Sequence, residues 1–243
     1  MENLKNLLVF ISPQKKFGDP YVTEFRLQVD NSLDLGWKPK DILVVTNFSW
    51  EYNGVKAIIV PDEHFCAVRP RSIKTAIIPF LIDEKIVEKG KIYWNHDSDA
   101  IQNSSITEKE LELDNIDCGL TDYGWRPRWC MGSFFFKDNS KDIFVKTRPE
   151  IFKDIEDETV MMELTQDPAI SERCKRLNVT YNFGMRNVES NYERAIKPIR
   201  IVHFHPFSRR LPTLDIFMYG KNGLNMPLMS ERLIKIFKYH GIS

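Results

Sequence analysis

The sequence predicts an α/β fold in which a mostly parallel central sheet is flanked by helices. Short apolar runs, each closed by a turn-forming or polar residue, alternate in the first half with stretches of helical periodicity. The connections between them are short, and this rhythm is typical of strand–helix–strand units that build parallel sheets. A chain of 243 residues with 42% hydrophobic content is also long enough for one large domain of this kind.

The first half supplies four strands and two helices in chain order. The first helix has Phe25, Val29 and Leu33 at spacing four, followed by Gly36 as a C-terminal cap. The fourth strand begins with an apolar run that turns polar within two residues and ends on Asp97 and Asp99. The expected strands cover residues 7–11, 41–46, 55–60 and the run from 92, and the expected helices cover 20–35 and 71–89.

The second half is less regular. One expected strand is interrupted by Gly132, a position where a backbone or a ligand can approach closely. The last expected helix is amphipathic and capped by Ser230. The expected strands cover residues 117–122, 129–136, 179–183 and 199–204, and the expected helices cover 151–165 and 230–239.

Composition excludes several classes of protein. Lys plus Arg equals Asp plus Glu at 34 each, so the net charge has no nucleic-acid or membrane-surface signature. No signal peptide is visible, and no apolar run approaches the roughly 18 residues of a membrane span. Four cysteines without C-x-x-C spacing indicate free thiols in a reducing compartment, so we expect a cytoplasmic protein; they are Cys66, Cys118, Cys130 and Cys174.

Asp97 and Asp99 are the first candidates for a site. Two carboxylates at i and i+2 share one face of a strand and can also converge in a tight turn. Their hard oxygens suit Mg²⁺ or Mn²⁺, and such a cation can in turn hold a diphosphate. The alternatives are a chance spacing and a pair of Asp residues that cap the next element.

Other polar residues are expected at the same edge of the sheet. Ser12 and Asn47 follow the first two strands, and carboxyl ends of parallel strands gather where ligands bind in such sheets. Arg71 and Lys74 open the helix before Asp97, so they are candidates for contacts with a nucleotide, or are surface charges.

His203 and His205 alternate on one late strand and so point to one face. A neutral imidazole is a good third ligand for a Mn²⁺ ion held by two carboxylates. Arg209, just beyond, is a candidate for phosphate oxygens. The alternative is a pair of hydrogen-bonded histidines at a strand end.

The acidic run at residues 156–158 is a candidate for the general base toward an acceptor hydroxyl. The alternative is a solvated helix start, where acidic side chains are favourable.

Taken together, these pieces resemble the nucleotide-sugar-dependent glycosyltransferases of the GT-A fold. The resemblance lies in the order of a polar first turn, a basic helix, Asp97-Ser98-Asp99, a glycine-containing strand, an acidic helix start, an L-N-V-T-Y-N-F segment and a late V-H-F-H. It implies that Asp97 and Asp99 hold the metal that bridges the donor diphosphate. It also implies that His203 or His205 completes the coordination, and that Asp157 or Glu158 acts as base.

The resemblance therefore implies one domain over residues 1–243, with a Rossmann-like nucleotide-binding half over 1–101 and an acceptor-binding half with the C-terminal helix over 102–243. The expected reaction moves a sugar from a nucleoside-diphosphate sugar to a hydroxyl of a glycan or other small acceptor, with Mn²⁺ or Mg²⁺.

Three alternatives remain open. A glycosyltransferase acting on a hydroxymethylated base in DNA is suggested by the more basic second half and by Arg126-Pro127-Arg128. A nucleotidyltransferase would be expected to carry a glycine-rich loop after the first strand, where Gly18 is the one glycine of residues 12–18. A non-catalytic sugar- or partner-binding module is the third.

Overall fold

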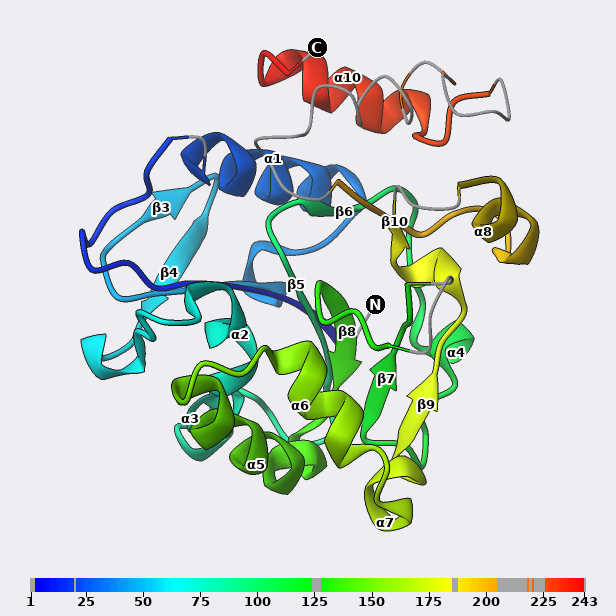
Figure 1. Ribbon diagram of the computed structural model, residues 1–243. Coiled ribbons are helices and arrows are strands. Elements are labelled where there is room, and N and C mark those ends of the chain that lie inside the picture. Colours follow the sequence, from blue (N-terminus) through cyan, green and yellow to red (C-terminus); the bar gives the residue numbers. More distant parts are fainter. Residues whose placement is uncertain are drawn as a thin grey trace.

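The computed structural model describes residues 3–19, 21–123, 128–184, 188–204, 218, 220 and 226–242. Within them, eight strands form one sheet in the order β3-β4-β2-β1-β5-β8-β7-β9, and a smaller sheet has the order β10-β11-β6 (Figure 1). The strands are β1 (Leu4–Phe10), β2 (Ile42–Thr46), β3 (Glu51–Tyr52), β4 (Val55–Ile59), β5 (Ile92–His96), β6 (Ala100–Gln102), β7 (Cys118–Leu120), β8 (Ser133–Phe136), β9 (Cys174–Arg176), β10 (Phe183–Gly184) and β11 (Ile201–His203).

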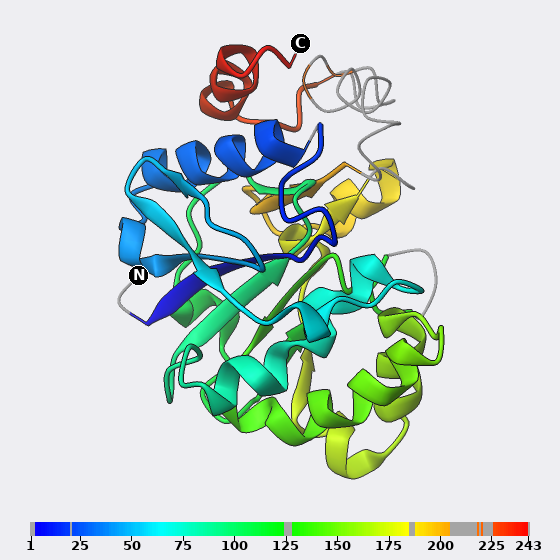
Figure 2. The same ribbon diagram turned by 90° about the vertical axis from the view of Figure 1, so that its left-hand side faces the viewer.

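Helices lie on both faces of the large sheet (Figure 2). Those described are α1 (Tyr21–Asp34), α2 (Ile73–Ala76), α3 (Ile78–Asp83), α4 (Glu108–Leu111), α5 (Lys141–Phe152), α6 (Asp157–Leu164), α7 (Pro168–Ser171), α8 (Val188–Arg194) and α10 (Glu231–Tyr239). Helix α1 packs its apolar residues on one face of this sheet, and α2, α3, α5 and α6 pack theirs on the other. Single 3₁₀ turns are η1 (Pro39–Asp41), η2 (Asp62–His64), η3 (Pro70–Ser72), η4 (Asp138–Ser140) and η5 (Val179–Tyr181).

The predicted fold is confirmed: a mostly parallel sheet lies between helical layers. Strands β4, β2, β1 and β5 are parallel neighbours, with Leu8 opposite both Val44 and His96. The sheet then changes direction, because β8 pairs antiparallel with β5 and places Ser133 opposite His96. The turn that follows β5 therefore lies beside the first residues of β8.

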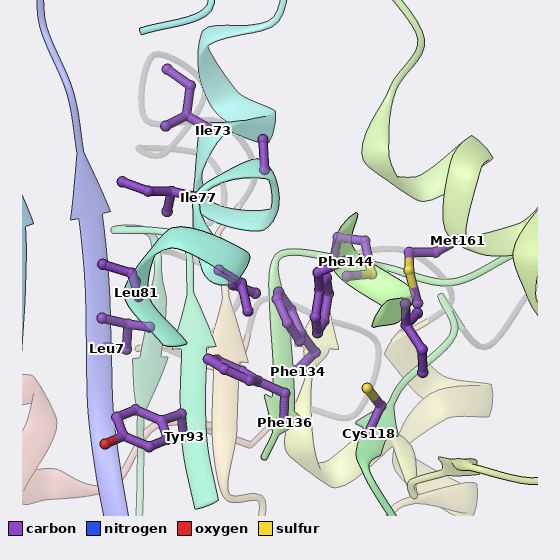
Figure 3. Packing of buried hydrophobic residues seen from close by; sticks show 14 of the residues in the cluster. Leu7, Ile73, Ile77, Leu81, Tyr93, Cys118, Phe134, Phe136, Phe144 and Met161 are labelled. Atoms are coloured by element: carbon purple, nitrogen blue, oxygen red, sulfur yellow. The ribbon is translucent and has the colours of Figure 1, made fainter. Parts of the chain in front are cut away.

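Alternate residues of the central strands enter different cores. On one face, Leu7 and Tyr93 pack with α2, α3, α5 and α6 in the cluster shown in Figure 3. On the other face, Leu8 and Trp94 pack with Phe25 of α1. This period of two is the pattern of a strand buried on both faces, and it fixes the direction in which the end of β5 points.

The helix α10 packs on α1 rather than on the sheet (Figure 1). The hydroxyl of Ser230 accepts a hydrogen bond from the N–H of Leu233, so the predicted cap is confirmed. Arg232 of α10 reaches Asp34 of α1 at 2.9 Å. None of the helices in the described ranges has the length and apolarity needed to cross a bilayer.

Four predicted elements differ from the structure. The strand predicted over 129–136 is a strand only in its second half, β8. The helix predicted over 71–89 is divided into α2 and α3 and ends at Asp83. Pro79 has no N–H for a helical bond, and Lys85 takes a left-handed conformation with φ 58°. The helix predicted over 151–165 is the end of α5 and all of α6, separated at Asp154 with φ 76°. The strand predicted over 179–183 is mostly the 3₁₀ turn η5.

All four cysteines lie in the described ranges and are free thiols, as predicted. Cys118 of β7 and Cys174 of β9 lie opposite each other in the register of the two parallel strands, and both are free thiols.

Candidate active site

A cleft of about 600 Å³ opens where β1 and β5 end. Its wall includes Ser12 after β1, Arg71 and Lys74 from the segment before β5, and the turn that carries Asp97 and Asp99. Phe10, Tyr21 and Phe25 give it an aromatic side. The cleft thus lies at the carboxyl edge of the parallel strands, where sheets of this class bind ligands.

Asp97, Asp99 and His203 converge in this cleft. One ligand atom from each lies within 4.8 Å of the others. The two carboxylates belong to the tight turn between β5 and β6, and His203 is the last residue of β11. Because β11 pairs antiparallel with β6, His203 lies opposite Ala100, directly after the turn. The small sheet therefore brings a residue from late in the chain to the two aspartates.

Helix α1 holds the Asp97–Asp99 turn in place. The side-chain amide of Gln28 donates to the carbonyl of Ser98 at 2.9 Å and to that of Ala100 at 2.8 Å. The hydroxyl of Ser98 donates to the carboxylate of Glu24. Both α1 side chains are buried, so the turn is fixed by contacts that exclude solvent.

Asn182 orients the ring of His203. The amide nitrogen of Asn182 donates to Thr121 Oγ1 at 2.9 Å, which leaves its oxygen 2.8 Å from His203 Nδ1. Nδ1 therefore carries a hydrogen, and Nε2 faces Asp99 Oδ1 at 3.3 Å. If a metal binds here, Nε2 is the ring nitrogen that would hold it, because an outer hydrogen bond to the other nitrogen commonly fixes a histidine ligand in this way.

The charge of His203 depends on Asp99. Burial alone lowers the pKa of an imidazole, but the neighbouring Asp99 carboxylate outweighs burial and raises the pKa of His203 to about 10. Asp99 therefore favours the protonated form of His203, and a metal bound at its Nε2 would have to replace a proton.

Gly132 makes room for His203. A Cβ atom at residue 132 would lie 2.1 Å from His203 Cε1. The carbonyl of Gly132 also accepts the N–H of Asp97 at 2.9 Å. The sequence predicts a close approach at this glycine, and in the structure it is a side chain of the same chain that approaches.

Lys74 is buried beside Asp97. Its Nζ lies 2.6 Å from Asp97 Oδ1 and 3.8 Å from Asp157 Oδ2. Burial opposes its charge, but Asp97 and Asp157 outweigh burial and hold the pKa of Lys74 above its ordinary value. Lys74 is thus a fixed positive charge rather than the surface charge of the alternative interpretation.

Asn47 supports Ser12 instead of lining the cleft with it. Its oxygen accepts the N–H of Ser12 and its nitrogen donates to the carbonyl of Ser12, both at 2.9 Å. The same nitrogen donates to Asp62 at 2.9 Å. Arg71 is exposed on the cleft wall. Roles for these residues in donor binding stay predictions.

Asp157 and Glu158 begin α6, and neither is among the described residues that line the cleft. Asp157 is buried and accepts the hydroxyl of Thr75 at 2.8 Å. Glu158 accepts the hydroxyl of Tyr123 and lies 3.3 Å from Arg128 Nε. Burial raises the pKa of Glu158. The general-base role stays a prediction.

Two predicted site residues, His205 and Arg209, lie outside the described residues. The supporting side chains Glu24, Gln28 and Asn182 were not predicted as part of the site. Asn182 belongs to the L-N-V-T-Y-N-F segment, which was the one sequence signal for it.

The fold is shared with solved glycosyltransferases. A glycosyltransferase involved in the glycosylation of the major capsid of PBCV-1 matches 87% of this chain and 99% of its own, with TM-score 0.54 and 13% identity. The glycosyltransferase GlyE of Streptococcus pneumoniae TIGR4 matches 98% of this chain, which spans 60% of GlyE, with TM-score 0.53 and 14% identity. Mouse xyloside xylosyltransferase 1 matches 83% of this chain and 97% of its own, with TM-score 0.51 and 12% identity.

No protein-family model and no curated protein matches the sequence. At these identities the similarity concerns the fold, and the chain has a fold that these glycosyltransferases share.

Proposed function

We propose that this chain is a metal-dependent glycosyltransferase of the GT-A type, which moves a sugar from a nucleoside-diphosphate sugar to a hydroxyl acceptor. One observation carries the proposal: Asp97, Asp99 and His203 converge in the cleft of a fold that solved glycosyltransferases share. The cleft volume of about 600 Å³ is in the range of sites that enclose a small organic ligand.

The donor atoms present fit a divalent cation. Two carboxylates offer hard oxygens, and His203 Nε2 offers one nitrogen. Mg²⁺ prefers an all-oxygen set, whereas Mn²⁺ is compatible with carboxylate and imidazole together, so the set favours Mn²⁺. A cation bound there would offset the negative charge that develops on a departing diphosphate.

The residues around the cleft suggest how the chain itself contributes. Ser12 and Arg71 lie on the wall near the aspartates and are candidates for binding the donor, with Arg71 suited to phosphate oxygens. Phe10 and Tyr21 offer apolar surface to a nucleoside. Glu158 has a raised pKa, which is favourable for a base that works near neutral pH, although its present partners are Tyr123 and Arg128.

The alternative of a DNA acceptor gains no support from the described residues. Arg126 and Pro127 of the basic segment lie outside them. Arg128 is paired with Glu156 at 2.6 Å and with Glu158 at 3.3 Å, so its charge is already balanced within the chain. A small hydroxyl acceptor or glycan therefore remains the proposed acceptor.

The test is a thermal-stabilisation screen of nucleoside-diphosphate sugars, each with Mn²⁺ and with a chelator. A xylosyl donor belongs in the first panel, because mouse xyloside xylosyltransferase 1 shares this fold. Ligands that bind the native state raise the melting temperature. At least one donor should stabilise the wild type only when Mn²⁺ is present, and Asp99→Asn should lose that shift. Stabilisation by no donor, or equally by donors with and without metal, would contradict the proposal. Metal-dependent turnover of that donor would then separate an enzyme from a non-catalytic sugar-binding module.

A further inference from the structure

Lys74 occupies a buried position defined by several contacts. Its ammonium lies 2.6 Å from Asp97 Oδ1 and donates to the carbonyl of Arg71 at 3.2 Å. Its own carbonyl accepts the side-chain amide of Asn95 at 2.8 Å. Only 7% of its side chain is exposed. A buried ammonium must be balanced by nearby negative charge, because its desolvation is costly.

Asp157 is not among the described residues that line the cleft, and it is hydrogen-bonded to the short helix α2 that carries Lys74. Its Oδ2 accepts the hydroxyl of Thr75 at 2.8 Å and lies 3.8 Å from the ammonium of Lys74. Its backbone N–H donates to Ser72 Oγ at 3.4 Å. The exposed fraction of its side chain is 8%, against 34% for Asp97. Asp157 is therefore directed at α2, whereas Asp97 faces the cleft.

The charges of this group balance only when Asp157 is counted. Lys74 contributes one positive charge, and Asp97, Asp99 and Asp157 contribute three negative charges. A divalent cation with a neutral His203 brings the sum to zero. Without Asp157, Asp97 would have to neutralise both Lys74 and part of the cation.

We propose that Asp157 is a positioning residue that shares the neutralisation of Lys74 with Asp97, so that Asp97 keeps negative charge for the divalent cation. This inference rests on the proposed metal site and gives Asp157 a different role from that of a general base. The two roles differ in what they predict: a base affects turnover, whereas a residue that neutralises Lys74 affects the affinity for the metal in the absence of any donor.

The experiment measures Mn²⁺ binding alone by titration calorimetry, without nucleotide or acceptor. Asp157→Asn keeps the shape and the acceptor for Thr75 but removes the charge. We expect it to weaken Mn²⁺ binding by about tenfold, the size of a coupling between neighbouring charged groups. Lys74→Met removes the competing positive charge and should not weaken binding.

The double variant Lys74→Met with Asp157→Asn is the decisive measurement. It removes one positive and one negative charge, so the net charge around the cation is the same as in wild type. Its Mn²⁺ affinity should return to within about threefold of wild type, since the two charges act on the metal only as a pair. Thr75→Val is the matched control. It removes the hydrogen bond from Thr75 to Asp157 without changing charge, and its Mn²⁺ affinity should stay near that of wild type.

Equal Mn²⁺ affinity in wild type and Asp157→Asn would overturn the role of Asp157, but it would not contradict the proposed metal site. A double variant as weak as Asp157→Asn would also overturn it. Absence of Mn²⁺ binding to the wild type would remove the metal site and this inference together. If Asp157→Asn alone fails to fold, the double variant still decides, because it must fold and bind Mn²⁺ like wild type.

Discussion

The imidazole of His203 lies against the Cα atom of Gly132, with no room between them for a side chain. A Cβ atom at residue 132 would come within 2.1 Å of His203 Cε1, 2.9 Å of Nε2 and 3.0 Å of Nδ1. The same glycine accepts the N–H of Asp97 through its carbonyl. Gly132 thus sets the position of two of the three groups proposed to hold the metal.

Replacing this glycine tests that relationship. Gly132→Ala must displace the His203 ring or the backbone that bonds Asp97, so Mn²⁺ affinity should fall by at least about tenfold, and overpacking should cost about 1–3 kcal/mol of stability. The measurements are Mn²⁺ titration and chemical denaturation.

Gly119→Ala is the matched control for that variant. A Cβ at residue 119 would meet the side chain of Leu177 at 2.8 Å, away from the proposed metal group. It should lower stability through overpacking while leaving Mn²⁺ affinity unchanged. Equal Mn²⁺ affinity in both alanine variants would mean that Gly132 does not position His203 for a metal.

Metal binding should release a proton from His203. The carboxylate of Asp99 outweighs the effect of burial and holds the pKa of His203 at about 10, so the metal-free imidazole is protonated at neutral pH. An imidazole must lose its extra proton before it can bind a metal, so Mn²⁺ affinity should rise with pH by about tenfold per unit below that pKa. Calorimetry in buffers of different ionisation enthalpy should show close to one proton released per Mn²⁺ at pH 7.

His203→Ala should weaken Mn²⁺ binding and remove most of that pH dependence. His205→Ala should do so less, because His203 is the histidine that converges with Asp97 and Asp99 within the described residues. An unchanged pH slope in His203→Ala would show that another group releases the proton.

The two aspartates should behave differently when neutralised. Asp99→Asn and Asp97→Asn should each abolish metal-dependent turnover. Asp97 is also the partner of buried Lys74 at 2.6 Å, so Asp97→Asn should lower the free energy of unfolding more than Asp99→Asn. Near-normal turnover in either variant, measured with saturating donor and Mn²⁺, would show that the residue concerned does not hold the metal.

The hydrogen bonds from Gln28 of α1 to the Asp97–Asp99 turn give a further test. Gln28→Leu leaves the carbonyls of Ser98 and Ala100 without this donor, at a cost of about 1–3 kcal/mol for buried acceptors. It should also weaken Mn²⁺ binding, because the turn is no longer held. Asn31→Leu is the control, since Asn31 bonds the carbonyl of Gln102 in the same way but beyond the turn. Weaker Mn²⁺ binding by the control than by Gln28→Leu would contradict this role for α1.

Much of the first half could be predicted because its signals are local. The apolar runs that form β1, β2, β4 and β5 are bounded by turn residues, and the structure places them as parallel neighbours. The position of Asp97 and Asp99 at a strand end follows from the same pattern. Pro79, by contrast, divides a helix whose apolar periodicity continues across it, so the pattern alone overstates its length.

The contacts that assemble the site could not be predicted because they join distant parts of the chain. Gln28 reaches Ser98, Asn182 reaches His203, and Thr75 reaches Asp157. Each depends on how layers pack and not on spacing within one element. The glycine at 132 carried a signal of close approach, but what approaches it is decided by the pairing of β11 with β6.

The most direct test of the proposed function is release of nucleoside diphosphate from a panel of nucleoside-diphosphate sugars. Wild type and Asp99→Asn are compared with Mn²⁺ and with a chelator, each with and without hydroxyl acceptors. The account predicts release from at least one donor by the wild type with Mn²⁺, and its loss in the chelator and in Asp99→Asn. Release that persists in the chelator, or that Asp99→Asn retains, would contradict a metal-dependent glycosyltransferase centred on Asp97, Asp99 and His203.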